Sequence, residues 1–196
     1  MGKIFYMMGK SSSGKDTILK RLLEDRTLGL SRMIMYTTRP IRTGETDGVE
    51  YHFVDEETMY RLAEEGKVIE ERTYPTKLGP WHYFTVDDGE VDISRHSFAA
   101  MGTLESYVQM RNYYGKETVF PIYIEVDDGV RLKRAVEREQ GEENPHYAEV
   151  CRRFLADETD FSEENLKKAG IKRRFKNETL EKTVDEVKRY CMERLR

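Results

Sequence analysis

The sequence predicts an α/β fold in three layers, with a parallel sheet between two layers of helices. Strand-like runs alternate with helical patterns along nearly the whole chain, and this alternation implies parallel strands joined by right-handed crossovers. A glycine-rich loop directly follows the first apolar run and precedes a helical pattern. The chain has 196 residues, which suits one domain with a substantial apolar core.

The predicted elements follow from the spacing of apolar residues. Short, mainly apolar runs predict strands at residues 3–8, 32–38, 68–74, 97–101, 119–126 and 173–176. Helical spacing or strong helix formers predict helices at residues 16–24, 56–65, 104–114, 129–139, 147–157 and 180–195. Residues 40–86 carry turn signals and a strand, helix, strand set of their own, and residues 140–147 are rich in Gly, Pro and Glu. These two excursions suggest a second substrate pocket and a closing lid.

Composition narrows the possible partners. Charged residues make up 36% of the chain, but the net charge is only −4, which argues against general nucleic-acid binding. The opening apolar run lacks a small-residue cleavage site, and no stretch approaches the roughly 20 apolar residues of a membrane span. Cys151 and Cys191 have no metal-ligand spacing around them. We therefore expect a cytoplasmic protein that binds neither a membrane nor a nucleic-acid polymer.

The glycine-rich loop has the spacing of a phosphate-binding loop. Its glycines let the backbone curl so that successive N–H groups point at a phosphate, and the following helix adds its positive N-terminal end. A lysine at the start of that helix can reach the outer phosphates. The predicted nucleotide-binding residues are Gly9, Lys10, Ser11, Ser12, Ser13, Gly14, Lys15, Asp16 and Thr17.

Asp16 departs from the usual loop pattern, which has Ser or Thr after the lysine to ligate magnesium. A carboxylate can also ligate Mg²⁺, directly or through water, so Asp16 and Thr17 are the candidate metal ligands. A carboxylate also lies close to a bound polyanion. We therefore expect like-charge repulsion to weaken nucleotide binding in the absence of metal.

A second informative run spans residues 36–54. It contains a Thr-Thr-Arg triplet, a second arginine, a Gly-Glu pair, a further glycine and a Tyr-x-Phe-Val segment, at Thr37, Thr38, Arg39, Arg42, Gly44, Glu45, Gly48, Tyr51, Phe53 and Val54. Together with the loop upstream, this run resembles the guanylate kinase signature. The resemblance implies transfer of the γ-phosphoryl group of ATP, bound with Mg²⁺, to GMP.

The same resemblance implies a single domain over residues 1–196 with a P-loop kinase core. The core comprises residues 1–35, 96–139 and 158–196, the NMP-binding excursion about 36–95, and the lid about 140–157. ATP and GMP are the expected small-molecule partners, and the protein is expected to be a monomer or homodimer.

Four residues form the predicted grip on the acceptor phosphate. Arg39 and Arg42 can point forked donors at one dianionic phosphate, and Tyr51 can add a hydroxyl donor. In guanylate kinases the matching residues hold the phosphate of GMP, and a later tyrosine completes the grip. Tyr83 is the candidate for that role here.

The base pocket matches the family less fully. Glu70 falls where the family places a glutamate that accepts hydrogen bonds from the N–H and amino groups of guanine. The acids that the family carries after the strand at 97–101 are missing, and Thr103 is the candidate acceptor there. Met35 or Tyr36 replaces the serine at the guanine carbonyl. The predicted GMP-binding set is Arg39, Arg42, Tyr51, Glu70, Tyr83, Thr85 and Thr103.

Further arginines resemble those that flank the family's lid. Arg134 and Arg138 have the spacing found before the lid, and Arg152 and Arg153 resemble the pair after it. In the family such arginines close over the phosphates and stabilise charge on the group in transfer. Asn177 aligns with an asparagine near the adenine of ATP, although an asparagine ahead of a helix is equally typical of a cap. The predicted catalytic residues are Lys15, Arg39, Arg134, Arg138, Arg152 and Arg153.

Two alternative functions stay open at this point. The altered base pocket suggests a related kinase for another phosphorylated acceptor, such as a different monophosphate or a ribose bisphosphate, although retention of Glu70 argues against a sugar. A non-catalytic guanylate kinase-like module that binds phosphorylated protein segments would also keep Arg39 and Arg42. In such modules the sequence of the donor loop has typically diverged, whereas this chain keeps Gly14 and Lys15.

Overall fold

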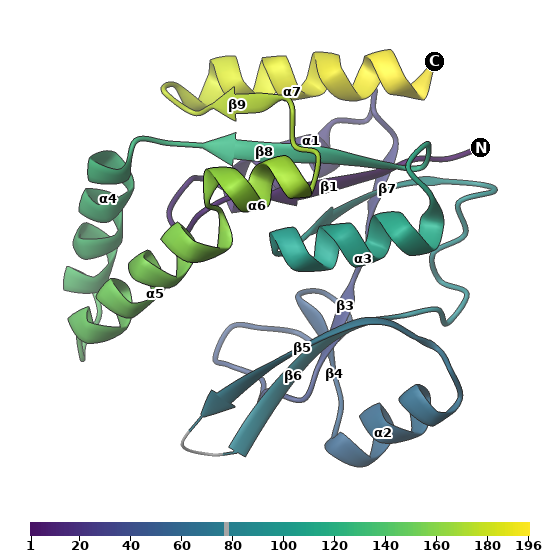
Figure 1. The fold of residues 1–196 in the computed structure, drawn as a ribbon, viewed down its shortest axis with the longest axis horizontal. Helices are drawn as coiled ribbons and strands as arrows, with labels where there is room; N and C mark the ends of the chain where they lie inside the picture. Colours follow the sequence, from purple (N-terminus) through teal and green to yellow (C-terminus); the bar gives the residue numbers. More distant parts are fainter. Residues whose placement is uncertain (77–78) are drawn as a thin grey trace.

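The computed structural model describes residues 1–76 and 79–196 and is built around a five-stranded parallel sheet (Figure 1). The strand order is β2-β7-β1-β8-β9, and neighbouring strands run parallel throughout. The strands are β1 (Ile4–Met8), β2 (Leu30–Arg32), β7 (Ser97–Met101), β8 (Val119–Glu125) and β9 (Arg174–Lys176). The predicted α/β class with a parallel sheet is confirmed.

Helices cover both faces of this sheet, and β1 is buried on both sides. Ile4 and Tyr6 pack with α3 (Leu104–Tyr114) on one face. Phe5 and Met7 pack with α1 (Lys15–Glu24) and α7 (Leu180–Leu195) on the other. A strand covered on both faces requires a continuous apolar run rather than an alternating one, which explains the opening sequence of the chain.

A second, four-stranded sheet lies beside the first, in the order β4-β3-β6-β5. Its strands are β3 (Met35–Thr37), β4 (Tyr51–Phe53), β5 (Val68–Thr76) and β6 (Gly79–Val86). Helix α2 (Glu56–Glu64) packs Met59 and Leu62 against Phe84 and Val86 of β6. This small sheet has its own core and, apart from β3, lies within the excursion predicted between residues 40 and 86.

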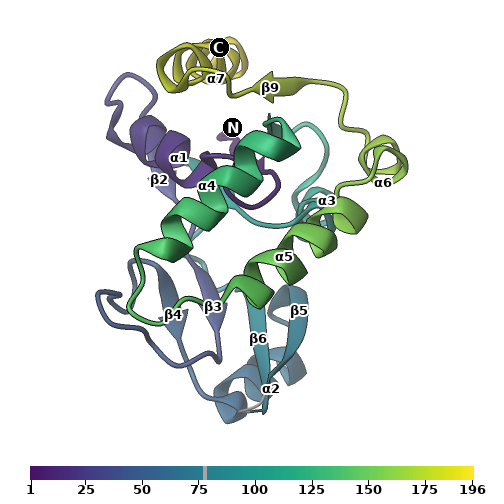
Figure 2. The same cartoon turned by 90° about the vertical axis from the view of Figure 1, so that its left-hand side faces the viewer.

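Two helices project beyond the carboxyl ends of β1 and β8 (Figures 1 and 2). They are α4 (Asp128–Gln140) and α5 (Tyr147–Asp160), and a short α6 (Glu163–Lys168) follows them. The loop between β1 and α1 opens on the same side, since it leaves the carboxyl end of β1. Ligands of parallel α/β sheets bind at this edge.

Some predicted boundaries were wrong. The single strand predicted at residues 32–38 is two strands, because β2 pairs with β7 in the large sheet whereas β3 pairs with β4 and β6 in the small one. Helix α5 continues to Asp160, beyond the predicted end at residue 157. Elements α6 and β6 were not predicted, and β4 had no predicted range. Helix α6 has only one buried residue, Leu166, so it leaves no helical periodicity in the sequence.

In the part of the chain that the structure describes, no helix combines the length and the apolar character needed to cross a membrane. The cytoplasmic location therefore stays a prediction from sequence. Nor do His, Cys, Asp and Glu side chains of the described residues form a preassembled metal site.

The two cysteine thiols are expected to react very differently. Cys151 is exposed on α5, whereas Cys191 is a buried residue of α7, and burial raises the pKa of the Cys191 thiol to about 12. At about pH 8, an aromatic disulfide reagent should therefore modify Cys151 alone in the native protein and both cysteines after denaturation. A Cys151→Ala variant should show no fast native reaction. Fast reaction of Cys191 in that variant would contradict the buried position of this thiol.

Candidate active site

The loop between β1 and α1 is curled as phosphate binding requires. Gly9 and Gly14 have φ angles of 156° and 83°. A Cβ atom at Gly9 would lie 2.5 Å from the carbonyl oxygen of Ile124, and one at Gly14 would lie 2.6 Å from Nδ2 of Asn177. Only glycine fits at either position. Among the described residues, Ser12 is the one non-glycine with a positive φ, 62°.

Two serine hydroxyls of the loop are left for a ligand. The Oγ atoms of Ser12 and Ser13 are buried and have no hydrogen-bond partner among the described residues. Buried hydroxyls in proteins are normally hydrogen-bonded. Their location at the N-terminus of α1, beside inward backbone N–H groups, fits hydrogen bonds to phosphate oxygens.

Lys15 and Asp16 begin helix α1 with opposite charges. The Lys15 side chain is 19% exposed and its Nζ lies 4.0 Å from Oδ2 of Asp16, which is 75% exposed. Burial lowers the pKa of Lys15. The carboxylate of Asp16 and the hydroxyl of Thr17 are hard oxygen ligands, and Mg²⁺ at nucleotide sites is typically held by one or two such groups together with phosphates and water. The donor set therefore fits magnesium bound jointly with a nucleotide.

A cavity of about 490 Å³ joins this loop to α4. Arg134 and Arg138 line it from α4, opposite Asp16 and Thr17. Predicted lid arginines and predicted metal ligands therefore share one cavity, although more than 110 residues separate them in the sequence. A positive wall opposite a phosphate loop is suited to a polyanion.

The other two predicted lid arginines lie on α5, and only one of them reaches the loop. Nη2 of Arg153 donates to Oγ of Ser11 at 3.4 Å. Arg152 instead pairs with Glu149 on its own helix at 2.7 Å, and both side chains are exposed.

A buried arginine that the sequence analysis missed holds the two projecting helices together. Arg131 of α4 is 1% exposed, and its guanidinium lies 4.0 Å from the ring centroid of Phe154 on α5. Its nitrogen atoms pair with three carboxylates, those of Asp128, Asp157 and Glu158. A planar guanidinium can serve several carboxylates and an aromatic face at once. Helices α4 and α5 are therefore joined by one ionic cluster.

The same cluster contacts the phosphate loop directly. Oδ2 of Asp157 accepts a hydrogen bond from the backbone N–H of Ser11 at 2.7 Å. Glu158 pairs with Lys10 at 2.6 Å. The backbone N–H groups of such a loop are its phosphate donors, so Asp157 presents a negative charge at the place where a polyanion would bind.

An Asp157→Asn variant is expected to bind metal-free ATP roughly fivefold more tightly than the wild type. The amide removes one negative charge near the polyphosphate, and two like charges at about 4 Å in water repel by about 1 kcal/mol. Titration calorimetry measures the difference. Glu164→Gln is the matched control, since it removes an exposed carboxylate that pairs with Lys168 on α6. Weaker ATP binding by Asp157→Asn would show that Asp157 instead holds the loop in its binding conformation.

Asn177 lies beneath the phosphate loop. Its Nδ2 donates to the carbonyl oxygen of Ser13 at 2.8 Å, and its Oδ1 accepts from the hydroxyl of Thr183 at 3.3 Å. The N-cap of α7 is Thr179, so the capping role considered for Asn177 is wrong. Asn177 supports the curled loop from below.

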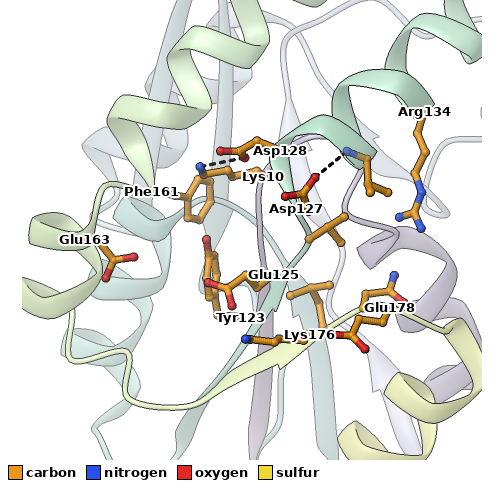
Figure 3. Close-up of a pocket in the computed structure, with 14 residues that line it drawn as sticks. Lys10, Tyr123, Glu125, Asp127, Asp128, Arg134, Phe161, Glu163, Lys176 and Glu178 are labelled. Atoms are coloured by element: carbon orange, nitrogen blue, oxygen red, sulfur yellow. Dashed lines mark hydrogen bonds and ion pairs between the residues drawn. The ribbon is translucent and has the colours of Figure 1, made fainter.

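A larger cavity of about 630 Å³ adjoins the first, since Arg134 and Asn177 line both. Figure 3 shows it at the carboxyl ends of β8 and β9, with Lys10 and Asp128 bridged at one side. The rings of Tyr123 and Phe161 stack in its wall with centroids 5.6 Å apart. This cavity is large enough for a nucleoside.

The predicted acceptor grip assembles on the small sheet. The guanidinium of Arg39 is buried and makes two hydrogen bonds of 2.9 Å to the carboxylate of Glu45. It lies over the rings of Tyr51 and Phe53, 5.6 Å and 5.4 Å from their centroids. Burial acts to lower the pKa of Arg39, but the hydrogen bonds and charges of Glu45 and Tyr83 together outweigh it, so the pKa lies above its ordinary value. Nε of Arg39 is buried and unpartnered among the described residues.

Tyr83 joins the same group from β6. Its ring centroid lies 5.7 Å from that of Tyr51, and Tyr83 pairs with Thr37 of β3 in the sheet register. Burial raises the pKa of Tyr51, so its hydroxyl stays a donor at neutral pH. Arg42 is exposed at the edge of the group, where its backbone N–H donates to Glu45 at 2.8 Å.

Glu70, the residue predicted to bind the base, is fully buried, with 0% of its side chain exposed. Thr85 donates its hydroxyl to Oε1 of Glu70 at 2.8 Å, and Arg72 donates from Nε to Oε2 at 3.0 Å. Thr103 is the N-cap of α3, where its hydroxyl accepts from the backbone N–H of Ser106. Arg72 was not among the predicted site residues, because a single arginine on a charged strand resembles an ordinary surface residue.

Residues 1–79 match the family model described as guanylate kinase. The matched segment is also similar in sequence to curated guanylate kinases. The matched residues include the phosphate loop, Arg39, Arg42, Tyr51 and Glu70. The curated guanylate kinase of Schizosaccharomyces pombe is 45% identical over 64 residues, 33% of this chain and 32% of its own length. That of Thermus thermophilus is 44% identical over 73 residues, 37% of this chain and 32% of its own length.

These sequence matches thus span about a third of the length of the curated guanylate kinases. The similarity in fold covers more of the chain than the similarity in sequence does. The crystal structure of guanylate kinase from Anaplasma phagocytophilum superposes with a TM-score of 0.69 at 20% identity, over 98% of this chain and 85% of that one. The guanylate kinase fold therefore covers the whole chain, including α4 and α5, for which the sequence matches give no support.

Proposed function

We propose that this protein transfers the γ-phosphoryl group of ATP to the phosphate of GMP and yields ADP and GDP. One observation supports this most directly: a phosphate loop and a second phosphate grip both occur within the residues that match the guanylate kinase family. Phosphoryl transfer depends on positioning and charge stabilisation rather than on a covalent intermediate. A pair of phosphate sites is therefore the main requirement for this activity.

On the donor side, the loop N–H groups and Lys15 would hold the phosphates of ATP. Asp16 and Thr17 would hold Mg²⁺, which when bound neutralises charge on the β- and γ-phosphates. The cavity of Figure 3 would take the adenosine, with the walls formed by Tyr123 and Phe161. Arg134, Arg138 and Arg153, and Arg152 after a change of partner, would then lie against the transferring group.

On the acceptor side, Arg39, Arg42, Tyr51 and Tyr83 would hold the phosphate of GMP. Glu45 is paired with Arg39 in this structure. The phosphate would therefore either bind Arg39 beside that carboxylate or displace the carboxylate from Arg39. The proposal divides the domain into a core at residues 1–35, 96–139 and 158–196, an NMP-binding region at about 36–95 and a lid at about 140–157. Closure of the lid would exclude water and suppress wasteful hydrolysis of ATP.

One observation favours a second candidate, a kinase for another phosphorylated acceptor. Both oxygens of Glu70 already accept hydrogen bonds from Arg72 and Thr85. The carboxylate predicted to bind guanine is therefore engaged within the protein. The curled loop with its two free serine hydroxyls argues against a module that binds phosphorylated proteins without ATP.

The test is magnesium-dependent formation of ADP from ATP, with GMP, dGMP, AMP, CMP, UMP and ribose bisphosphate offered separately. Turnover with GMP supports the proposal, and turnover with another acceptor alone replaces it with the second candidate. If no acceptor is phosphorylated, a titration with ATP distinguishes an inactive kinase, which binds it, from a binding module, which does not.

A further inference from the structure

Arg72 separates Glu70 from the cavity in which an acceptor base would lie. This cavity, of about 670 Å³, lies between β5 and α3, and Arg72 lines it together with Tyr74, Leu104 and Val108. Glu70 does not line it and has no exposed side-chain surface. Any flat ring in this cavity therefore meets the guanidinium of Arg72 before it can meet the carboxylate of Glu70.

Glu70 fixes the orientation of that guanidinium. Nε of Arg72 donates to Oε2 of Glu70 at 3.0 Å, and Nη2 donates to Oε1 at 3.3 Å. The hydroxyl of Thr85 holds Oε1 from the neighbouring strand at 2.8 Å. A two-point pair between a planar guanidinium and a carboxylate is rigid. Nη1 takes no part in these two bonds, so its N–H groups are not needed to hold the guanidinium against Glu70.

At the position of Glu70, the group that lines the cavity is thus a donor, Arg72, rather than an acceptor. A carboxylate reads the N1–H and 2-amino donors of guanine. A guanidinium reads acceptors, and the O6 and N7 atoms of a 6-oxopurine form the acceptor pair that arginine recognises best. Adenine has an amino donor in place of O6 on that edge.

We propose that Arg72, held in position by Glu70, selects the acceptor by binding the O6/N7 edge of a 6-oxopurine nucleoside monophosphate. This inference rests on the proposed kinase function and specifies which residue selects the base of the acceptor. Glu70 is then a positioning residue rather than a direct contact. The 2-amino group of guanine contributes little to such recognition, so inosine monophosphate (IMP) is accepted about as well as GMP, while AMP is rejected.

Besides Glu71, which pairs with His82, two carboxylates that line the cavity provide the competing arrangement. Glu105 and Asp160 also line the cavity, and burial raises the pKa of Asp160. If either bound the 2-amino group, the protein would discriminate strongly between GMP and IMP. The comparison of these two nucleotides in the wild-type protein therefore decides between the arrangements without any substitution.

The first experiment measures kcat/KM of the wild type for GMP, IMP and AMP with saturating Mg-ATP. The expected values for GMP and IMP agree within about threefold, and that for AMP is lower by roughly 10- to 100-fold, the usual discrimination of one bidentate arginine. A value for IMP more than about tenfold below that for GMP would overturn the proposal.

The second experiment compares Arg72→Lys and Arg72→Gln with the wild type. Both are expected to lose roughly 10- to 100-fold in kcat/KM for GMP and IMP, mainly through KM, while AMP changes less than about threefold. Arg61→Lys is the matched control, since Arg61 is an exposed arginine on α2 that also pairs with a glutamate. Thermal melts check that each variant folds. Unchanged discrimination between GMP and AMP in both folded variants would overturn the proposal.

Equilibrium binding separates this inference from the kinase activity itself. If the wild type phosphorylates no purine monophosphate, the proposed function fails, and titration calorimetry with GMP, IMP and AMP then tests the base rule alone. Equal binding of GMP and IMP that depends on Arg72 would support the rule for a binding protein. Binding of AMP as tight as that of GMP would overturn it.

Discussion

A Lys15→Ala variant is expected to lose roughly 10²- to 10³-fold in kcat for ADP formation from ATP and GMP. The loss follows from the position of Lys15 at the start of α1, inside the curled loop and largely shielded from water. One preorganised charge or donor at a transferring group typically contributes this much. Steady-state ADP release, measured with both nucleotides saturating, gives the effect directly.

Lys20→Ala is the matched control for this prediction. Lys20 is on the same helix, is 77% exposed and lies at 4.0 Å from Glu24. Alanine is a strong helix former, so neither substitution should unfold α1. Activity of Lys15→Ala within about threefold of the Lys20→Ala control would mean that the loop does not hold the donor phosphates.

An Arg39→Lys variant is expected to lower kcat/KM for GMP by roughly 10- to 100-fold and to leave KM for ATP unchanged. Lysine keeps the charge but cannot make the two parallel hydrogen bonds that Arg39 makes, and each charge-assisted bond contributes about 1.5–3 kcal/mol. The pair with Glu45, with both bonds at 2.9 Å, shows that the guanidinium can donate two parallel hydrogen bonds to two oxygens of one anion. Initial rates over a range of GMP and ATP concentrations test the prediction.

The interpretation of Arg39→Lys needs a check on folding, because Arg39 is buried against Tyr51 and Phe53. Thermal melts of the variant and of Arg61→Lys, an exposed arginine on the neighbouring helix, provide it. A folded variant whose KM rises for ATP instead of GMP would assign Arg39 to the donor nucleotide and reverse the two halves of the site.

The predicted groupings of residues that the structure contains are local in the chain. Gly9, Gly14 and Lys15 belong to one loop between one strand and one helix, so the spacing alone implies the curled backbone that the structure contains. Arg39 and Tyr51 belong to one short signature, and both are found on the same small sheet. A short motif of this kind predicts the relative positions of its side chains, because only a few residues separate them in the chain.

Local patterns in the chain were enough to predict the α/β class, the parallel sheet, the curled glycine-rich loop and the grouping of Arg39 with Tyr51. They did not indicate that residues 32–38 divide between two sheets, that Asp157 bonds to the phosphate loop, or that Arg72 covers Glu70. Hydrophobic periodicity records whether a residue is buried, but it does not record which strand or side chain lies opposite. Contacts between charged groups from distant segments leave no periodic pattern in the sequence. The pairing of Arg72 with Glu70 and the hydrogen bond between Asp157 and the phosphate loop were therefore found only in the folded chain.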